Sequence, residues 1–247
     1  MLQYFDKRYG LRRLNTLQQK TNALKAAFPY TIPVMTGYLF LGIAFGILLD
    51  SKGYHFGWSI LMSVFVYAGS MQFVAVNLLT MAFNPLNAFL ITLMVNARHL
   101  FYGLSMLGKF KGTENKKPYL IFGFTDETYS ILCSAEPPKG VDRGWFMFFI
   151  TLLDQIYWVA ASAIGALLGS MFVFNTKGID FVMTALFVVI FMNQWKAQNH
   201  HAPAIIGVAA SVVCLLLFGS ENFIIPAMIL ITLALTTFKK PIEKGAE

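Results

Sequence analysis

Long apolar runs dominate the sequence and limit what the chain can fold into. One helical crossing of a bilayer needs about 20 mostly apolar residues. The apolar runs occupy residues 29–49, 56–82, 85–107, 144–173, 180–195, 202–218 and 222–238, and a shorter, more polar run occupies residues 119–135. The chain therefore has room for roughly six to eight membrane segments, and it is predicted to form an all-α polytopic membrane helix bundle.

The composition supports lipid as the main solvent of this surface. Hydrophobic residues make up 57% of the 247 residues and charged residues only 13%, whereas soluble domains carry about 25% charged residues. The mean hydropathy is +0.61. A soluble domain of this length would have too much surface to cover with so few charges.

Positive charge is concentrated in three stretches. Residues 1–28 carry six lysines and arginines against one aspartate, residues 108–118 carry four lysines against one glutamate, and residues 239–247 carry three lysines against two glutamates. Lysine and arginine collect in cytoplasmic segments beside membrane helices. These segments lack the long basic face that a phosphate backbone requires, so the charge indicates membrane orientation and excludes a nucleic-acid partner.

The same pattern divides the chain into three parts. We expect a cytoplasmic basic arm at 1–28, a transmembrane transport domain at 29–238 and a cytoplasmic tail at 239–247. The arm is not predicted to be a signal peptide, because it is mostly polar and no convincing cleavage site follows the first apolar run. Two possibilities stay open for its structure: an interfacial helix on the inner leaflet or a loosely ordered arm.

Weak internal similarity relates the two halves. Residues 44–49 read AFGILL and residues 163–168 read AIGALL. Charge placement adds a constraint on run 56–82, because a full crossing there would put the basic 108–118 loop outside. If the run instead breaks near Ala68-Gly69-Ser70 and turns back, that loop lies inside.

This arrangement predicts two inverted three-segment repeats with broken central helices, a plan that many transporters use. Run 119–135 then crosses outward, run 144–173 crosses inward, and a second broken segment lies at 180–200. The alternative is a plain bundle in which run 56–82 crosses fully and the basic loop violates the charge rule.

Ionisable groups inside apolar runs are the first candidates for function, because each costs about 2.5–3.5 kcal/mol to insert. Asp154 lies deep in run 144–173 and is a candidate proton carrier or partner for a substrate ammonium group. The alternative is a structural tie between helices. Trp158 is one helical turn further and shares its face. Ala161, Gly165 and Gly169 continue that face as small residues suited to close helix packing.

The predicted break supplies a second candidate. Interrupting the helix at Gly69 and Ser70 exposes backbone N–H groups and a positive helix terminus to a substrate carboxylate; a simple glycine kink is the alternative. The predicted substrate-binding residues are Gly69, Ser70, Gln72, Phe73, Asp154, Gln155, Tyr157, Trp158 and Gln194.

Charged groups near the break are candidates for coupling or gating. Arg98 lies well inside run 85–107, and its expected counterion is Asp126, Glu127 or Asp154. Thr125 is placed to cap a short helix with two acidic residues in its first turn. The predicted coupling or gating residues are Asn96, Arg98, His99, Asp126 and Glu127; structural ion pairing and packing are the alternatives.

Several chemistries find little support. Cys133 and Cys214 form neither a disulfide framework nor a metal cluster, and the adjacent His200 and His201 do not share a helical face. No Gly-rich phosphate loop is present. A serine and a histidine in separate helices are too common to indicate an intramembrane hydrolase. We therefore predict no enzyme activity, no cofactor and no metal site.

Four motifs taken together resemble the AzlC family, which includes the BrnF-type large subunits of branched-chain amino acid exporters. They are YAGSMQF at 67–73, NARHLFYG at 96–103, TDETYS at 125–130 and LDQIYW at 153–158. The resemblance extends from about Pro29 to Trp195. Ala161 departs from the glycine expected after the last motif.

The resemblance implies a function beyond what composition shows. It implies a permease subunit that exports leucine, isoleucine and valine across the bacterial inner membrane, together with a small hydrophobic AzlD-type subunit. Because no ATP-binding motif is present, the proton gradient is the expected energy source. The alternatives are a passive channel or facilitator for a small solute, and a non-transporting assembly subunit.

Overall fold

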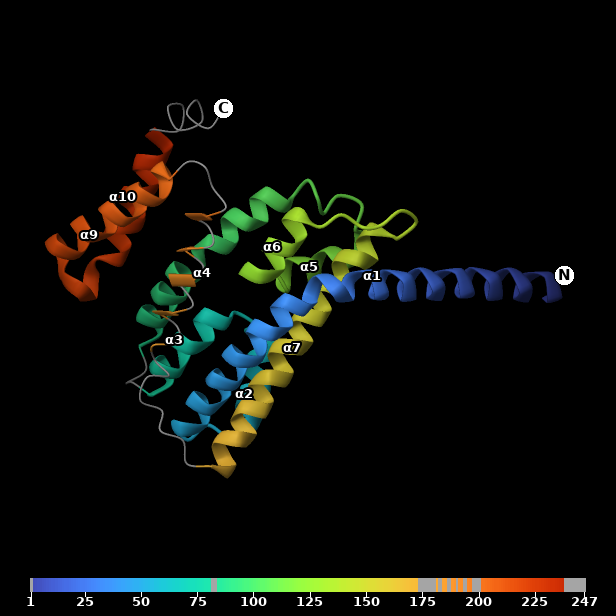
Figure 1. Cartoon of the computed structure of the whole chain (residues 1–247), viewed down its shortest axis with the longest axis horizontal. Helices are drawn as coiled ribbons and strands as arrows, with labels where there is room; N and C mark the ends of the chain where they lie inside the picture. The colour runs from blue at the N-terminus through green and yellow to red at the C-terminus, as the bar shows by residue number, and fades with distance from the viewer. Residues whose placement is uncertain are drawn as a thin grey trace. The chain divides into compact units, whose positions relative to one another are not determined.

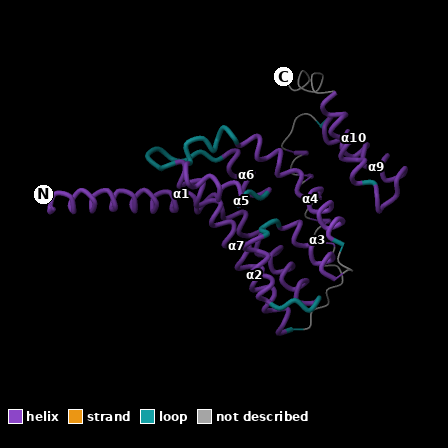
Figure 2. The backbone as a smooth tube through the Cα atoms, turned by 180° about the vertical axis from the view of Figure 1, so that it is seen from behind, coloured by secondary structure: helices purple, strands orange, loops and turns teal. Residues whose placement is uncertain are grey.

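The computed structural model describes residues 2–80, 84–172 and 201–237, together with scattered residues between 181 and 196. The chain forms two compact units, residues 1–179 and residues 180–247, which are described separately. Every regular element among the described residues is a helix (Figure 2). The prediction of an all-α membrane bundle is confirmed.

Two long helices form the frame of the first unit. Helix α1 spans Leu2–Ser51 and α7 spans Arg143–Met171. The part of α1 from Leu17 to Ser51 and the whole of α7 are long and apolar enough to cross a membrane. Pro29 and Pro33 lie inside α1, each without the N–H that an α-helix needs, and α1 bends before it runs along α7 (Figure 1).

Small residues let α1 and α7 approach until their backbones touch. An ideal Cβ at Gly46 would meet backbone atoms of Ser162, Gly165 and Ala166, and one at Gly165 would meet the backbone of Ile43. The similar hexapeptides 44–49 and 163–168 thus pack against each other. This confirms the packing role expected for the small residues of α7.

The predicted break in run 56–82 is present. Helix α2 spans Phe56–Phe65, and α3 spans Gly69–Thr80. Between them Tyr67 has a φ of 40°, in the left-handed region. The Tyr54 hydroxyl donates to the Leu79 carbonyl at 3.0 Å, so the residues that precede α2 lie beside the end of α3. A straight helix would separate them by roughly 37 Å, and the segment is therefore a hairpin that returns to the end where it started.

A second hairpin follows α4. Helix α4 spans Pro85–Met106, and after a one-turn 3₁₀ helix η1 at Glu114–Lys116 come α5 at Lys117–Phe122 and α6 at Asp126–Ser134. With 6 and 9 residues, α5 and α6 are roughly 9 and 14 Å long, too short to cross a core of about 30 Å. The Lys109 ammonium donates to the carbonyls of Leu132 and Cys133. The hairpin thus ends beside the loop from which it starts.

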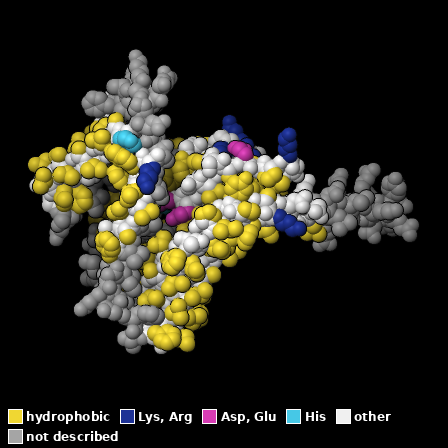
Figure 3. Space-filling model, viewed as in Figure 1, with side chains coloured by type: hydrophobic (Ala, Val, Ile, Leu, Met, Phe, Trp, Pro, Cys, Tyr) yellow, Lys and Arg dark blue, Asp and Glu magenta, His cyan; other side chains and the backbone are white. Residues whose placement is uncertain are grey.

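Two of the three basic stretches, residues 1–28 and residues 108–118, lie at one end of this unit. The Lys20 and Lys116 ammonium groups lie 4.4 and 4.6 Å from the centroid of the Trp145 ring. A buried cluster at the same end joins Ala27 of α1, Met106 of α4 and Phe146 of α7. Lysine and arginine side chains gather near α5 and α6, while hydrophobic side chains cover α7 (Figure 3). This shared end agrees with the prediction that the 1–28 arm and the 108–118 loop lie on the same side of the membrane.

The predicted direction of two runs was wrong. Run 119–135 does not cross outward, because it forms the short α5–α6 hairpin. Run 144–173 therefore runs parallel to α1 instead of inward: Lys20 lies beside Trp145 at one end, and Asp50 lies beside Gly169 at the other. The inversion expected between 44–49 and 163–168 is not confirmed. Most of the second predicted break, at 180–200, lies outside the described residues.

The second unit contains a helical hairpin. Helix α9 spans Ala202–Asn222 and α10 spans Ile224–Thr237, and the two pack together. Gly219 interrupts α9 with a φ of 73°, a backbone conformation that glycine adopts without steric cost. The predicted apolar runs 202–218 and 222–238 agree with these two helices.

The first hairpin makes a prediction about membrane sidedness. Single cysteines placed at Lys52 and Asn84, in a variant whose two native cysteines are replaced by serine, are expected to react with an impermeant maleimide from the same side of the membrane. Cysteines placed at Lys111 and Lys139 are expected to react from the opposite side. Labelling of intact and lysed cells measures both. If the Lys52 and Asn84 positions label from opposite sides, the segment between them crosses fully and the hairpin is wrong.

Candidate functional site

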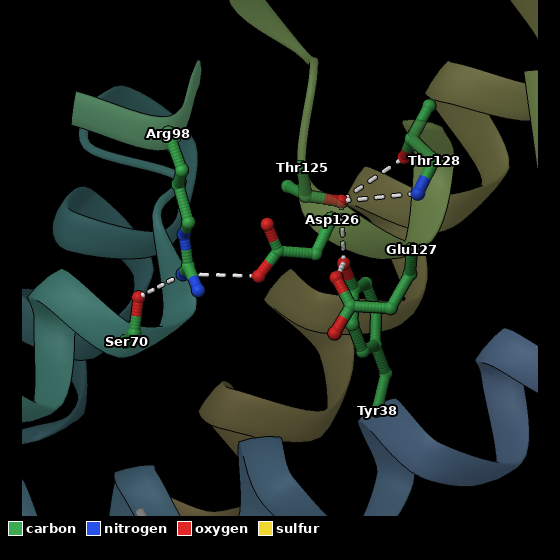
Figure 4. A network of polar contacts seen from close by, with 7 residues as sticks. All are labelled: Tyr38, Ser70, Arg98, Thr125, Asp126, Glu127 and Thr128. Carbon is green, nitrogen blue, oxygen red and sulfur yellow. Dashed lines mark hydrogen bonds and ion pairs between the residues drawn. The ribbon is translucent and has the colours of Figure 1, made fainter. Parts of the chain in front are cut away.

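Arg98 of α4 connects the tips of the two hairpins. Its guanidinium donates to the Ser70 hydroxyl at 2.6 Å, and the same nitrogen lies 2.9 Å from a carboxylate oxygen of Asp126 (Figure 4). Ser70 is the second residue of α3 and Asp126 is the first residue of α6. The rings of Tyr67 and Phe122 also meet there, with centroids 6.4 Å apart. Two interrupted helices therefore meet around one arginine.

The first turn of α6 is capped as its sequence predicts. The Thr125 hydroxyl accepts a hydrogen bond from the Thr128 backbone N–H at 3.3 Å, the bond that an N-cap side chain makes. Asp126 and Glu127 occupy the positive end of this helix, where carboxylates are stabilised. Of the three counterions considered for Arg98, the structure selects Asp126.

A buried hydrogen-bond network extends from this cap to α1 and α7. The Tyr38 hydroxyl lies 2.8 Å from the Thr125 hydroxyl and donates to Glu127 at 2.8 Å (Figure 4). The Thr128 hydroxyl donates to Oδ2 of Asp154 at 2.8 Å. Asp154 is fully buried, and its Oδ1 has no hydrogen-bond partner. Asp154 thus ties two helices through a hydroxyl group, with one carboxylate oxygen still available.

A second network joins α7 to the first hairpin. The Trp158 indole N–H donates to the Gln72 side-chain carbonyl at 2.8 Å, and the Gln72 amide donates to the Ser63 hydroxyl at 3.2 Å. Trp158 also covers Gly69, where an ideal Cβ would lie 3.2 Å from its ring. Phe45 packs against both Trp158 and Phe73. Glycine at 69 lets the break lie close against this ring.

Gln155 serves both hairpins. Its amide donates to the Val64 carbonyl at 3.2 Å, and its side-chain carbonyl accepts from the Tyr119 hydroxyl at 2.6 Å. The last carbonyls of a helix have no intrahelical donor, so Gln155 satisfies one that the break in run 56–82 leaves open. Tyr157 points elsewhere and shares a 3.1 Å hydrogen bond with Thr31.

The predicted residues fall into three groups. Ser70, Arg98 and Asp126 form the charged cluster between the hairpin tips. The buried networks on α7 contain Gln72, Phe73, Glu127, Asp154, Gln155 and Trp158, with Gly69 against the Trp158 ring. Three have other contacts: Tyr157 contacts Thr31, Asn96 lies on α4 with a buried and unpartnered side-chain oxygen, and His99, next to Arg98 in the chain, contacts Tyr102. Gln194 lies outside the described residues.

Sequence reasoning did not identify the hydroxyl groups that bond the site residues. The hydroxyls of Tyr38 and Thr128 donate to the carboxylates of Glu127 and Asp154, and those of Ser63 and Tyr119 bond the side-chain amides of Gln72 and Gln155. Tyrosine, serine and threonine are common in membrane helices, so only Thr128, three residues after the predicted cap, carried a positional signal. Among the described residues no group of histidine, cysteine and carboxylate side chains could hold a metal ion.

The indole–amide bond makes a prediction about stability. Trp158→Phe keeps most of the apolar ring and leaves the buried Gln72 carbonyl without a donor, which is expected to lower the free energy of unfolding by about 1–3 kcal/mol. Gln72→Leu in the same chain removes the orphaned group and is expected to recover part of that loss. Thermal unfolding of the purified protein measures both, with the half-exposed Trp58 changed to phenylalanine as control. Equal losses for Trp58→Phe and Trp158→Phe would show that the bond has no stabilising role.

Comparison with known proteins places the chain in a family. The family model described as AzlC protein matches residues 33–172, more than half of the chain. A Bacillus subtilis protein named "Branched-chain amino acid transport protein AzlC" is 56% identical over 232 residues, which cover 94% of this chain and 91% of that protein.

More distant relatives cover a similar share. An uncharacterized membrane protein of Helicobacter pylori is 47% identical, covering 90% of this chain and 97% of its own length. The Escherichia coli inner membrane protein YgaZ is 26% identical, covering 81% and 82%. No solved structure matches the chain. From the family match and the near full-length identity, the chain belongs to the AzlC family of membrane proteins.

Proposed function

We propose that this chain is the permease subunit of a secondary active exporter for leucine, isoleucine and valine. The observation that carries the proposal is the 56% identity to a protein named for branched-chain amino acid transport. The structure supports it with two interrupted helices that meet at buried polar groups, an arrangement that transporters use for substrate sites near the bilayer midplane.

The site offers the groups that an amino acid needs. The start of α3 presents backbone N–H groups without intrahelical partners, and Ser70 lies there beside Arg98. These groups suit a carboxylate. Trp158 and Phe73 lie against the same hairpin and supply apolar surface for a branched side chain. Gln72 is assigned a structural role, because its amide already bonds Ser63 and Trp158.

Asp154 is proposed as the proton-coupling group. It lies on a helix that contacts both hairpins, it is fully buried, and one of its oxygens has no hydrogen-bond partner. Protonation would change its bond with Thr128 of α6 and so couple charge to the position of that hairpin. His99 on α4 is the second proposed titrating group. Burial of Asp154 argues against its other proposed role as the acceptor of the substrate ammonium group.

The remaining assignments follow the charge pattern and the family. We propose that the protein lies in the bacterial inner membrane with the N-terminal arm and the Lys109–Lys117 loop in the cytoplasm. The arm is helical, because α1 continues through it without interruption. A small hydrophobic AzlD-type subunit is proposed as the partner. Neither metal nor organic cofactor is required by this mechanism.

The rival functions predict different transport behaviour. A passive channel would let amino acids equilibrate but would not extrude them against a gradient. An assembly subunit would tolerate substitutions at the hairpin tips as long as the complex formed. The charged groups at those tips favour the transport role, because ionisable groups at membrane depth are costly to keep.

Export makes a direct prediction. Cells that carry this chain with its small partner, fed a branched-chain dipeptide, are expected to hold lower internal isoleucine than empty cells, and an uncoupler is expected to abolish the difference. Chromatography of cell extracts measures this, with cells that carry the chain alone as the test of the partner. Internal levels equal to those of empty cells, with both proteins in the membrane, would contradict branched-chain export.

The coupling role predicts the effect of one substitution. Asp154→Asn keeps the size of the side chain and removes its titration, so uphill export is expected to fall severely and the remaining flux to lose its dependence on pH. Asp50→Asn, at the far end of α1 near Gly169, is the matched control and is expected to behave as wild type. Normal export by Asp154→Asn with unchanged pH dependence would exclude proton coupling at this residue.

A further inference from the structure

We infer that the Arg98–Asp126 ion pair is the recognition site for the two charged groups of the substrate, and that the substrate binds by exchange with this pair. The substrate carboxylate takes the place of Asp126 on Arg98, and the substrate ammonium takes the place of Arg98 at Asp126. This inference rests on the proposed transport of amino acids and assigns the residues that select the substrate class.

The position of the pair suits this role. Arg98 lies in the middle of α4, and it contacts Ser70 at the tip of one hairpin and Asp126 at the tip of the other. Ser70 and Asp126 come from segments that enter the unit from opposite ends, and both project toward the guanidinium (Figure 4). The pair is thus the point where the two interrupted helices are held together by charge.

Accessibility separates this pair from the buried carboxylate on α7. The Arg98 and Asp126 side chains are 25% and 15% exposed, whereas Asp154 is 0% exposed. Asp126 bonds Arg98 through Oδ2, while its Oδ1 is buried and has no hydrogen-bond partner. A small solute therefore reaches the Arg98–Asp126 pair before it reaches Asp154.

The energetics of the exchange favour a zwitterion. Removing one partner from a partly buried ion pair leaves an uncompensated charge, which is strongly unfavourable. An amine alone would take the place of Arg98 at Asp126 without supplying a carboxylate to Arg98, and a carboxylate alone would leave Asp126 without a cation from the substrate. An α-amino acid supplies both charges on one carbon atom and compensates both residues at once. Arginine is also suited to bind a carboxylate through two parallel hydrogen bonds.

The same geometry links recognition to opening. Arg98 and Asp126 are in direct contact at 2.9 Å, so a substrate between them must move the α6 tip away from α4. The tips close when the pair reforms after release. Longer zwitterions fit less well, because a dipeptide carries its two charges at opposite ends of a peptide unit. The pair therefore selects single α-amino acids with both groups free.

Analogues that lack one charge test this inference. In proteoliposomes that contain the chain and its small partner, isoleucine transport is challenged with isoleucinamide, which lacks the carboxylate, and with 3-methylpentanoate, which lacks the ammonium. Wild-type protein is expected to prefer isoleucine to either analogue by roughly tenfold or more, from the charge-assisted hydrogen bonds that each analogue loses.

Neutral variants then identify which residue reads which charge. Arg98→Gln is expected to lose most of the preference over isoleucinamide and to keep the preference over 3-methylpentanoate, and Asp126→Asn is expected to do the reverse. Lys139→Gln, at an exposed position of the loop before α7, is the control and should keep both preferences. If a neutral variant does not accumulate, Arg98→Lys or Asp126→Glu, which retains the charge, takes its place. The preferences for isoleucine over isoleucinamide and over 3-methylpentanoate are then measured in that variant.

Two outcomes separate the failures. If wild-type protein neither binds nor transports isoleucine, the proposed function is wrong. If it does, but Arg98→Gln and Asp126→Asn weaken isoleucine and both analogues by the same factor, the pair is a structural latch and the recognition role is overturned.

Discussion

The structure depends on how the backbone hydrogen-bonding groups at the ends of a broken helix find partners inside a bilayer. A helix that stops in hydrocarbon leaves carbonyl and N–H groups without water, and such groups are tolerated only where protein covers them. Helix α7 provides much of that cover. Gln155 bonds the Val64 carbonyl at the end of α2, and Ser59 of α2 bonds the Ser162 carbonyl of α7 at 2.9 Å. The Asp154 carboxylate accepts a hydrogen bond from the hydroxyl of Thr128 on α6. Both hairpins are therefore anchored on one helix.

Close packing of α1 against α7 makes this possible. The contact at Gly46 and Gly165 brings the two backbones together, which turns the polar residues of α7 away from lipid and toward the hairpins. Tyr38 of α1 then lies within hydrogen-bond distance of Thr125 and Glu127 at the α6 tip. The small residues lie away from the charged cluster, yet their packing determines where Tyr38 and the polar residues of α7 lie around the α6 tip.

Much of this arrangement was predictable because it follows from local or charge-based rules. The break near Ala68-Gly69-Ser70 was predicted from the position of the basic loop, and the Thr125 cap from its spacing to Asp126 and Glu127. The direction in which α7 crosses the membrane was predicted wrongly. Hydropathy marks an apolar stretch without showing whether it crosses, and only the shortness of α5 and α6 reveals a second hairpin. The sequence left three candidate counterions for Arg98. It could not select one of them, because pairing across helices depends on tertiary distance.

The two acidic centres are suited to different tasks. Asp126 is partly exposed and faces an arginine, so it can exchange partners with a solute. Asp154 is buried and bonded to Thr128, and Glu127 is bonded to Tyr38, so in the proposed mechanism each responds to the position of α6 instead of to the solute itself. Substrate that displaces the α6 tip must strain the bonds of the buried carboxylates, because all three acidic groups bond through the same short helix. In the proposed mechanism, that shared helix is the physical route from substrate exchange at Arg98 to a change in charge at Asp154.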